Sequence, residues 1–469
     1  MTCVTGGTDR LCPLACFGGP WNTAGMTTQQ PSSKLPLPPG ATGLPLLGET
    51  LAFLRGPRPF ALERQRRHGN VFRTHLFGAP AVMMMGSDAA RWVFAGENKY
   101  LYTRWARGTR QVLPTQSITS LTGEAHQARR RLLAPHFTPA QLRGLMPGVQ
   151  AVAARHLAGW ASRPGVLTVR PAMSTLIFEA AVSLLFGDVK LDVARMNGLF
   201  KTWTQGLFTA LPLNVPFTTH GKSLAAKREL LALLDGVVAE REKLSSQPGD
   251  ILGSLLSVRD EEGRPLTREA VLDELLLQFL ASHDNTMSTL ANIVLLLAQH
   301  PEVLQRCRDE QRGASLDEPV TLERLRDFPY LHQVILEGLR FIPPVGGLMR
   351  VTTQEVEFGG YRIPKGWRVM LSLGATHHMA PWTEPGQFDP DRMGPARAEH
   401  QQQSHCFISF GGGARSCLGQ HFALAEMAIV LALLVRGYRW ELVPGQDLTF
   451  TAIPFPHPRS GIQVHFSRL

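Results

Sequence analysis

The residues best suited to chemistry lie in a glycine-rich segment near the C-terminus, Phe410–Gly419, which reads FGGGARSCLG. Three consecutive glycines let a backbone approach a flat ligand without side-chain clash. Cys417 follows them and precedes an apolar stretch, residues 422–435, which we expect to form a helix. Backbone N–H groups at a helix N-terminus lower the pKa of a nearby thiol. A thiolate here suits axial ligation of a haem iron with Arg415 on a propionate, and a buried cysteine beside a glycine turn is the alternative.

The elements that must position this segment are mostly helical. Helical periodicity prevails from Pro57 to about Gly347, and short strands follow. We expect these strands at residues 348–351, 355–358, 362–363, 368–372, 438–442 and 462–466. Helices followed by a small set of strands indicate an α+β fold, mainly α with small β-sheets, in a single large domain.

The longest expected helix runs from Thr267, a capping residue, to about Gln299, just before Pro301. It is apolar on nearly every face, which predicts burial in a large core. Five consecutive polar residues, Ser282–Thr286, interrupt this pattern. A kink explains some polar residues in a buried helix, but five together exceed what a kink requires. This polar stretch is therefore a second candidate for chemistry.

The composition of the 469 residues narrows the class of protein. A hydrophobic content of 44% and a charged content of 18% are those of a globular protein, not of a disordered or fibrous one. The net charge of +10 is compatible with nucleic acid, a membrane surface or an acidic partner. The chain lacks a recognised nucleic-acid-binding module, so we expect no nucleic acid. The six cysteines form no CxxC pair and no zinc spacing, which indicates a reducing compartment.

The N-terminal part is expected to lie outside the folded domain. Residues 1–30 are interpreted as a disordered extension in which Met26 is an alternative start, and residues 31–469 as the domain. No stretch approaches the roughly 18–20 apolar residues of a membrane span. The N-terminus also lacks a secretion signal. We expect a soluble, cytoplasmic, bacterial protein with at most peripheral membrane contact.

The pattern FxxGxxxCxG, carried by Phe410, Gly413, Cys417 and Gly419, resembles the haem-binding loop of the cytochrome P450 monooxygenases. Three further motifs occur in the order of that family, and they are Ala281–Thr286, Glu337–Arg340 and Phe388–Arg392. The resemblance implies the cytochrome P450 fold around haem b. It also implies a lipophilic substrate, O2, and two electrons from a ferredoxin-type donor and its reductase.

Glu337 and Arg340 are three residues apart and share a helix face. Alone, such a pair is usually solvated and contributes about 0.3–0.5 kcal/mol. Apolar neighbours predict burial here, and the resemblance adds Arg392 as the third member of a structural triad. Breaking a buried pair of this kind costs several kcal/mol.

The polar stretch in the long helix resembles the family's oxygen-activation motif with two departures. Family members carry a glycine and a threonine where this chain has Ser282 and Asn285, whereas Asp284 retains the acid. The resemblance implies that Asp284 and an alcohol deliver protons to bound oxygen. Thr286 lies one residue later, about 100° further round the helix. The relay then passes through Asn285 and water, or through Thr286 after local unwinding.

Several cations are expected to hold the haem propionates. His126 and Arg130 are four residues apart on one predicted helix and resemble the family's propionate-binding helix. Arg350 matches its strand arginine, and Phe410 and Gly411 are expected to contact the haem. A basic patch made by residues 129–131 with Arg415 is expected to steer an acidic electron donor.

The access region is expected at residues 100–117, 199–217, 345–348 and 453–455. The expected substrate-pocket residues are Trp105, Phe208, Leu211, Ala281, Val345, Leu348 and Phe455. The apolar bulk of residues 199–217 is attributed partly to packing and partly to an exposed lid or membrane-touching patch.

Residues 104–110 and 206–216 resemble the retinoid-hydroxylase group, which has vertebrate and cyanobacterial members. This implies a retinoid or carotenoid hydroxylated at or near its ionone ring, with a carotenoid lacking a carboxylate favoured. Arg104, Arg107 and Arg110 either bind a carboxylate or face solvent. The alternatives are a peroxide-driven hydroxylase and a non-enzymatic haem sensor or carrier. The sequence leaves open the exact substrate, the donor and the oligomeric state.

Overall fold

The computed structural model describes residues 34–44, 47–187, 189, 191–209, 212–315, 318–321, 323–451 and 455–469. The expected N-terminal extension, residues 1–30, lies outside these ranges.

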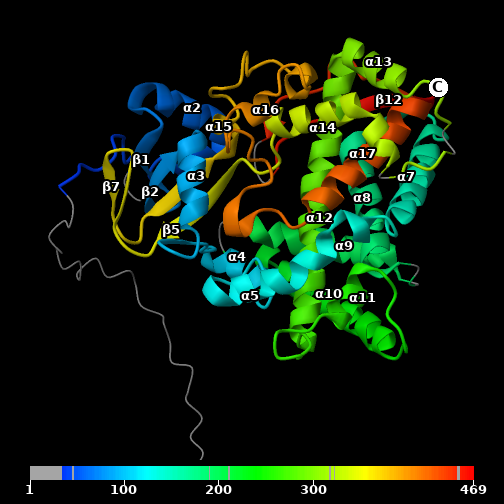
Figure 1. The fold of residues 1–469 in the computed structure, drawn as a ribbon, viewed down its shortest axis with the longest axis horizontal. Helices are drawn as coiled ribbons and strands as arrows, with labels where there is room; N and C mark the ends of the chain where they lie inside the picture. The colour runs from blue at the N-terminus through cyan, green and yellow to red at the C-terminus, as the bar shows by residue number, and fades with distance from the viewer. Residues whose placement is uncertain are drawn as a thin grey trace, which may run out of the picture.

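Helices dominate the structure; the largest sheet lies at the left of Figure 1, and a smaller sheet near the C-terminus lies at the upper right. The helices are α1 Thr50–Arg55, α2 Pro57–His68, α3 Ser87–Gly96, α4 Arg107–Val112, α5 Gly123–Leu133, α6 Pro139–Leu142, α7 Met146–Ala161, α8 Val169–Phe186, α9 Val193–Thr204, α10 Thr219–Glu242, α11 Ile251–Ser257, α12 Arg268–Gln299, α13 Pro301–Glu310, α14 Pro329–Phe341, α15 Leu373–Thr376, α16 Glu399–Gln402 and α17 Gln420–Gly437. The strands are β1 Val71–Leu76, β2 Ala79–Met84, β3 Leu101–Tyr102, β4 Val166–Thr168, β5 Gly347–Thr352, β6 Val356–Phe358, β7 Tyr361–Ile363, β8 Arg368–Ser372, β9 Tyr438–Leu442, β10 Phe450–Thr451, β11 His457–Pro458 and β12 Gln463–Arg468. The α+β class is therefore confirmed.

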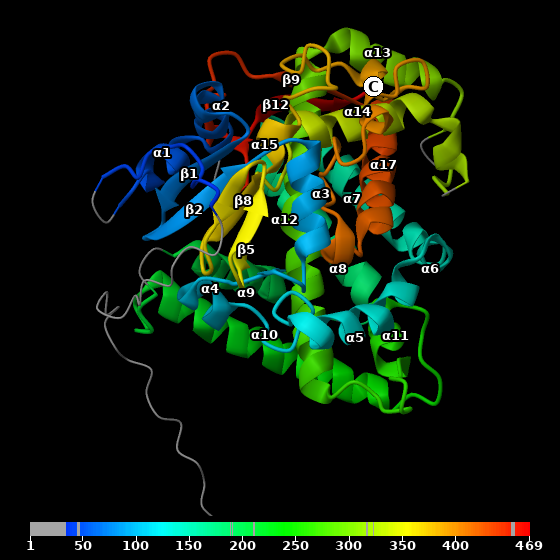
Figure 2. The same ribbon diagram turned by 60° about the vertical axis from the view of Figure 1, so that its left-hand side comes forward.

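The long helix α12 crosses the middle of the helical part, with α8 and α17 beside it (Figure 2). The Thr267 hydroxyl accepts from the Ala270 N–H at 3.2 Å and caps its first turn. The stretch Leu290–Leu297 is buried on every face because neighbouring helices cover it. The expected long, buried helix is confirmed.

The largest sheet has the strand order β1-β2-β8-β5-β3 and corrects one expectation. Helical periodicity was expected throughout residues 57–347, but residues 71–84 form an antiparallel hairpin. Its turn places Phe77 and Gly78 at φ of 52° and 75°, in the left-handed region. The strand β2 then pairs in parallel with β8, from a distant part of the chain. The six strands expected after residue 347 lie within about two residues of their observed ends, but β10 and β11 were not predicted.

Two helices, α8 and α17, are long and apolar enough to cross a membrane by composition alone. Of their apolar windows, 67% and 72% of the residues are buried inside the protein. Both helices pack in the main hydrophobic core with α12. Their hydrophobicity is therefore accounted for by the core.

Candidate active site

A cavity lies between α12 and the glycine-rich segment that contains Cys417. Its volume is about 430 Å³. The expected site residues on its lining are Trp105, His126, Arg130, Ala281, Asn285, Thr286, Val345, Leu348, Arg350, Phe410, Gly411, Arg415 and Cys417. Residues from widely separated parts of the chain thus meet around one cavity.

The glycines beside Cys417 are required by close packing against α3. A Cβ on Gly412 would lie 2.5 Å from the ring of Phe94, and one on Gly413 would lie 2.7 Å from its carbonyl oxygen. Gly411 and Gly413 also adopt positive φ values of 68° and 62°. We expected these glycines to allow the approach of a flat ligand. The structure adds a second reason for them, because α3 already packs against one side of the segment.

The Cys417 thiol is free and is exposed to the cavity. The helix α17 begins shortly after it, at Gln420. Burial raises the pKa of Cys417, although the Gly419 N–H and the Arg130 guanidinium act in the opposite direction. The expected lowering by the helix N-terminus is thus present but outweighed. Coordination to a metal deprotonates a thiol outright, so the position still suits an iron ligand.

A carboxylate that the sequence did not reveal organises the arginines around the cavity. Glu97, at the end of α3, accepts from Arg415 Nε at 2.7 Å and also pairs with Arg350 Nε. Arg130 donates to the carbonyl and hydroxyl oxygens of Ser416 at 2.8 and 2.7 Å. Three guanidinium groups therefore line the cavity, two of them on one carboxylate, and the excess of positive charge suits two haem propionates.

His126 provides the observation that tests whether the cavity fits a haem. Its side chain is buried, and Nδ1 has no hydrogen-bond partner among the described residues. Burial, together with Arg415 and Arg130, lowers the pKa of His126 to about 4. A buried polar atom normally has a partner. The unpaired Nδ1 beside a cationic cavity therefore fits a ligand that carries carboxylates, as haem b does.

The polar stretch of α12 remains regular helix, so the local unwinding considered for Thr286 is not observed. Asn285 and Thr286 both line the cavity without it. Asp284 is instead paired with Nδ1 of His283 at 2.8 Å. His283 Nε2 in turn lies 3.0 Å from the carbonyl oxygen of Ser174 on α8. No pattern in the sequence indicated this pairing across two helices.

Glu337, Arg340 and Arg392 meet outside the cavity lining, with no exposed side-chain surface. Arg340 binds both carboxylate oxygens of Glu337 at 2.7 Å, and Arg392 Nε donates to Glu337 Oε1 at 3.1 Å. Glu399, which the sequence did not single out, accepts from Arg392 at 3.0 Å. Two carboxylates thus balance two buried arginines.

The wall of the cavity includes apolar residues that the sequence reasoning missed. They come from α8, α11 and α12 and are Ala181, Leu184, Leu185, Ile251 and Leu277. Of the remaining expected pocket residues, Leu211 lies outside the described residues, as does the side chain of Phe208. Phe455 is not part of the lining within the described chain.

The apolar segment 199–217 divides as its composition suggested. Phe200, Trp203 and Leu207 are buried in the core. Leu213 and Phe217 are exposed, at 55% and 79%. The large exposed hydrophobic residues of the described part of this segment therefore lie in its second half.

The expected basic patch is smaller than its sequence suggests. Arg129 turns inward and binds Glu274 at 2.7 Å, and Arg130 faces the cavity. Arg131 remains exposed. In the access region, Arg104, Arg107 and Arg110 are exposed as well, which agrees with the solvent-facing alternative.

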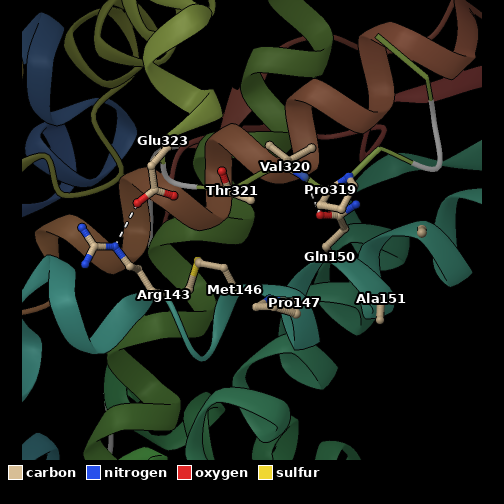
Figure 3. Close-up of a pocket in the computed structure, with 10 residues that line it drawn as sticks. Arg143, Met146, Pro147, Gln150, Ala151, Pro319, Val320, Thr321 and Glu323 are labelled. Atoms are coloured by element: carbon tan, nitrogen blue, oxygen red, sulfur yellow. Dashed lines mark hydrogen bonds and ion pairs between the residues drawn. The ribbon is translucent and has the colours of Figure 1, made fainter.

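A second cavity lies between α7 and the segment that contains residues 319–321 and Glu323 (Figure 3). None of its lining residues lines the cavity that contains Cys417. Arg143 and Glu323 form an ion pair across it at 2.9 Å. Gln150 accepts from the Val320 N–H at 2.7 Å. The hydrogen-bonding groups of these residues are thus paired with one another. The described lining of this cavity contains no reactive group comparable to Cys417.

Comparisons with known proteins agree with this geometry. The family model described as Cytochrome P450 matches residues 38–466. The chain is 35% identical to Putative cytochrome P450 120 of Synechocystis over 93% of this chain and 98% of the relative. It is 33% identical to human Cytochrome P450 26C1 over 99% of this chain and 95% of the relative. The solved structure called Retinoic acid bound cyanobacterial CYP120A1 matches with a TM-score of 0.86 and 35% identity, covering 93% of this chain and 100% of the other.

Proposed function

The chain belongs to the cytochrome P450 family, and from this premise we propose that it hydroxylates a lipophilic isoprenoid, a retinoid or a carotenoid, at or near its ring. Its cofactor is haem b, and its class of activity is that of a monooxygenase. The apolar wall formed by Leu184, Leu185 and Leu277 in the cavity of Cys417 is the observation that carries the choice of substrate. A relative solved with retinoic acid supports it.

Thiolate-ligated haem b, when bound, supplies the activation of O2 and the oxidising power that inserts one oxygen atom into a C–H bond. Cys417 would supply the thiolate that ligates the haem iron. The haem propionates would be held through charge-assisted hydrogen bonds by Arg130, Arg350, Arg415 and His126. The apolar wall excludes water and orients the isoprenoid ring.

The proton path is assigned to α12. The Oδ1 atom of Asn285 is buried without a partner among the described residues, and it can hold a water in the cavity. Asp284 is hydrogen-bonded to His283 and is not among the described lining residues, whereas its neighbour Asn285 is. We therefore place Asn285, rather than Thr286, at the cavity end of the path.

Electrons are proposed to come from a ferredoxin-type donor and its reductase. The exposed Arg131, although it pairs with Glu261 at 3.5 Å, supports this, because acidic donors are steered by surface cations. We place the protein in the bacterial cytoplasm, at most in peripheral contact with a membrane.

An optical titration of the purified haem protein tests this proposal. Retinoic acid, β-ionone and a carotenoid are added, and a saturable shift of the Soret band is expected with at least one. A Soret band that none of them perturbs would overturn the substrate assignment. Turnover with peroxide but not with a ferredoxin system would favour the peroxide-driven alternative.

A further inference from the structure

We propose that Asp273 and Glu274, adjacent acids on α12, are positioning residues that hold residues 113–121, the roof segment, over the cavity. Ile118 and Thr119 of this segment line the cavity. This role rests on the proposed function only in that the cavity is taken to be the substrate site.

The two carboxylates bind the roof segment directly. Asp273 Oδ2 accepts from the Gln116 N–H at 2.7 Å and from the Thr115 hydroxyl at 3.3 Å. Glu274 Oε1 accepts from the Ile118 N–H at 2.9 Å. The N–H groups of Gln116 and Ile118 lie outside helices and strands, so they lack a partner from regular secondary structure. The two carboxylates accept their hydrogen bonds instead.

A cation from α5 completes the attachment. Arg129 Nη1 donates to Glu274 Oε1 and to the Gln116 carbonyl oxygen, both at 2.7 Å. On the other side, Arg415 Nη2 donates to the Leu121 carbonyl oxygen at 2.6 Å. The roof segment is thus tied both to α12 and to the segment that carries Cys417.

Because Glu274 is buried, the stability of the closed roof segment should depend on pH. Glu274 has no exposed side-chain surface, and burial raises its pKa to about 7, although Arg129 and the Ile118 N–H act against this. Asp273 raises it further, and Lys227 on α10 faces Asp273. When the roof opens, Glu274 meets water and its pKa falls toward about 4.3. The closed roof therefore binds the proton more tightly, and it loses stability as pH rises from about 4.3 to about 7.

Hydrogen exchange of the substrate-free haem protein tests the proposal. Asp273→Ala should speed exchange in residues 113–121 about tenfold, because it removes a charged acceptor. Asp273→Asn, which keeps an acceptor oxygen, should restore most of the protection. The control is Glu269→Gln, an exposed acid on the same helix, which should change nothing.

Glu274→Gln is the second variant. After correction for intrinsic rates, the wild type should lose protection in the roof segment between pH 5 and pH 7, and this variant should not. Unchanged exchange in folded Asp273→Ala, or a wild-type pH dependence in Glu274→Gln, would overturn the proposal. A uniform rise across the whole chain would overturn it too, since that indicates a general structural role. These outcomes are independent of whether an isoprenoid binds.

Discussion

Two parts of the cavity that contains Cys417 differ in how their polar groups are hydrogen-bonded. One is the side formed by residues 410–419 with Arg350, here called the wall, and the other is the roof segment. In the wall, Arg415 and Arg350 meet one carboxylate, and the Cys417 N–H donates to Phe410 within the same segment at 2.9 Å. In the roof, the Gln116 and Ile118 N–H groups depend on two acids of α12, whereas those of Ser120 and Leu121 donate to the Ser117 carbonyl oxygen within the segment. The wall is therefore expected to be rigid and the roof to be the part that can open.

The largest effect is expected from a substitution of Cys417, the central residue of the wall. Cys417→Ala removes the proposed thiolate ligand of the haem iron, so the red-shifted Soret band of the reduced carbon monoxide complex and the hydroxylase activity should both be lost. Cys406→Ala is the matched control, because that thiol is buried outside the cavity lining. Retention of the thiolate spectrum in Cys417→Ala would contradict the assignment.

The buried triad behind the wall should be next in size. Glu337→Gln leaves two arginines short of a charge, so the free energy of unfolding should fall by about 3–5 kcal/mol in denaturant titrations. Asp391→Asn breaks an exposed ion pair with Arg306 in the neighbouring motif and should cost less than about 1 kcal/mol. Equal losses in the two variants would show that burial does not set the cost.

A substitution in the cavity should have a moderate effect on binding and leave the fold unchanged. Ala281→Leu adds bulk to the lining and should weaken isoprenoid binding about tenfold in the Soret titration. Ala151→Leu, in the second cavity, should leave binding as it is. Unchanged binding in Ala281→Leu, as in the control, would mean that the substrate lies elsewhere.

The last prediction concerns how the stability of the protein depends on pH. Glu426 lines the cavity, its Oε1 has no partner among the described residues, and burial raises its pKa to about 8. A raised pKa contributes stability at low pH that is lost as pH rises through about 8. Glu426→Gln should therefore raise the free energy of unfolding at pH 9 by roughly 2 kcal/mol and flatten its pH dependence. A variant less stable at pH 9 would argue for a hidden partner.

Local spacing made much of the wall predictable. Cys417 and Arg415 lie within one short motif, as does the Glu337–Arg340 pair outside the cavity, and periodicity located α12 and most of the later strands. Glu97 was not predictable, because its partners Arg350 and Arg415 lie 253 and 318 residues away in the chain. The contact of Asp273 with Gln116 spans 157 residues and was missed for the same reason.

Turnover under oxygen-18 gas is the decisive experiment for the monooxygenase activity. The purified haem protein would be supplied with a ferredoxin, its reductase and the isoprenoid that shifts the Soret band, and the product analysed by mass spectrometry. We expect a hydroxylated product with a single oxygen-18 atom. A bound isoprenoid that is never oxidised, or a hydroxyl oxygen that comes from water, would contradict the assignment.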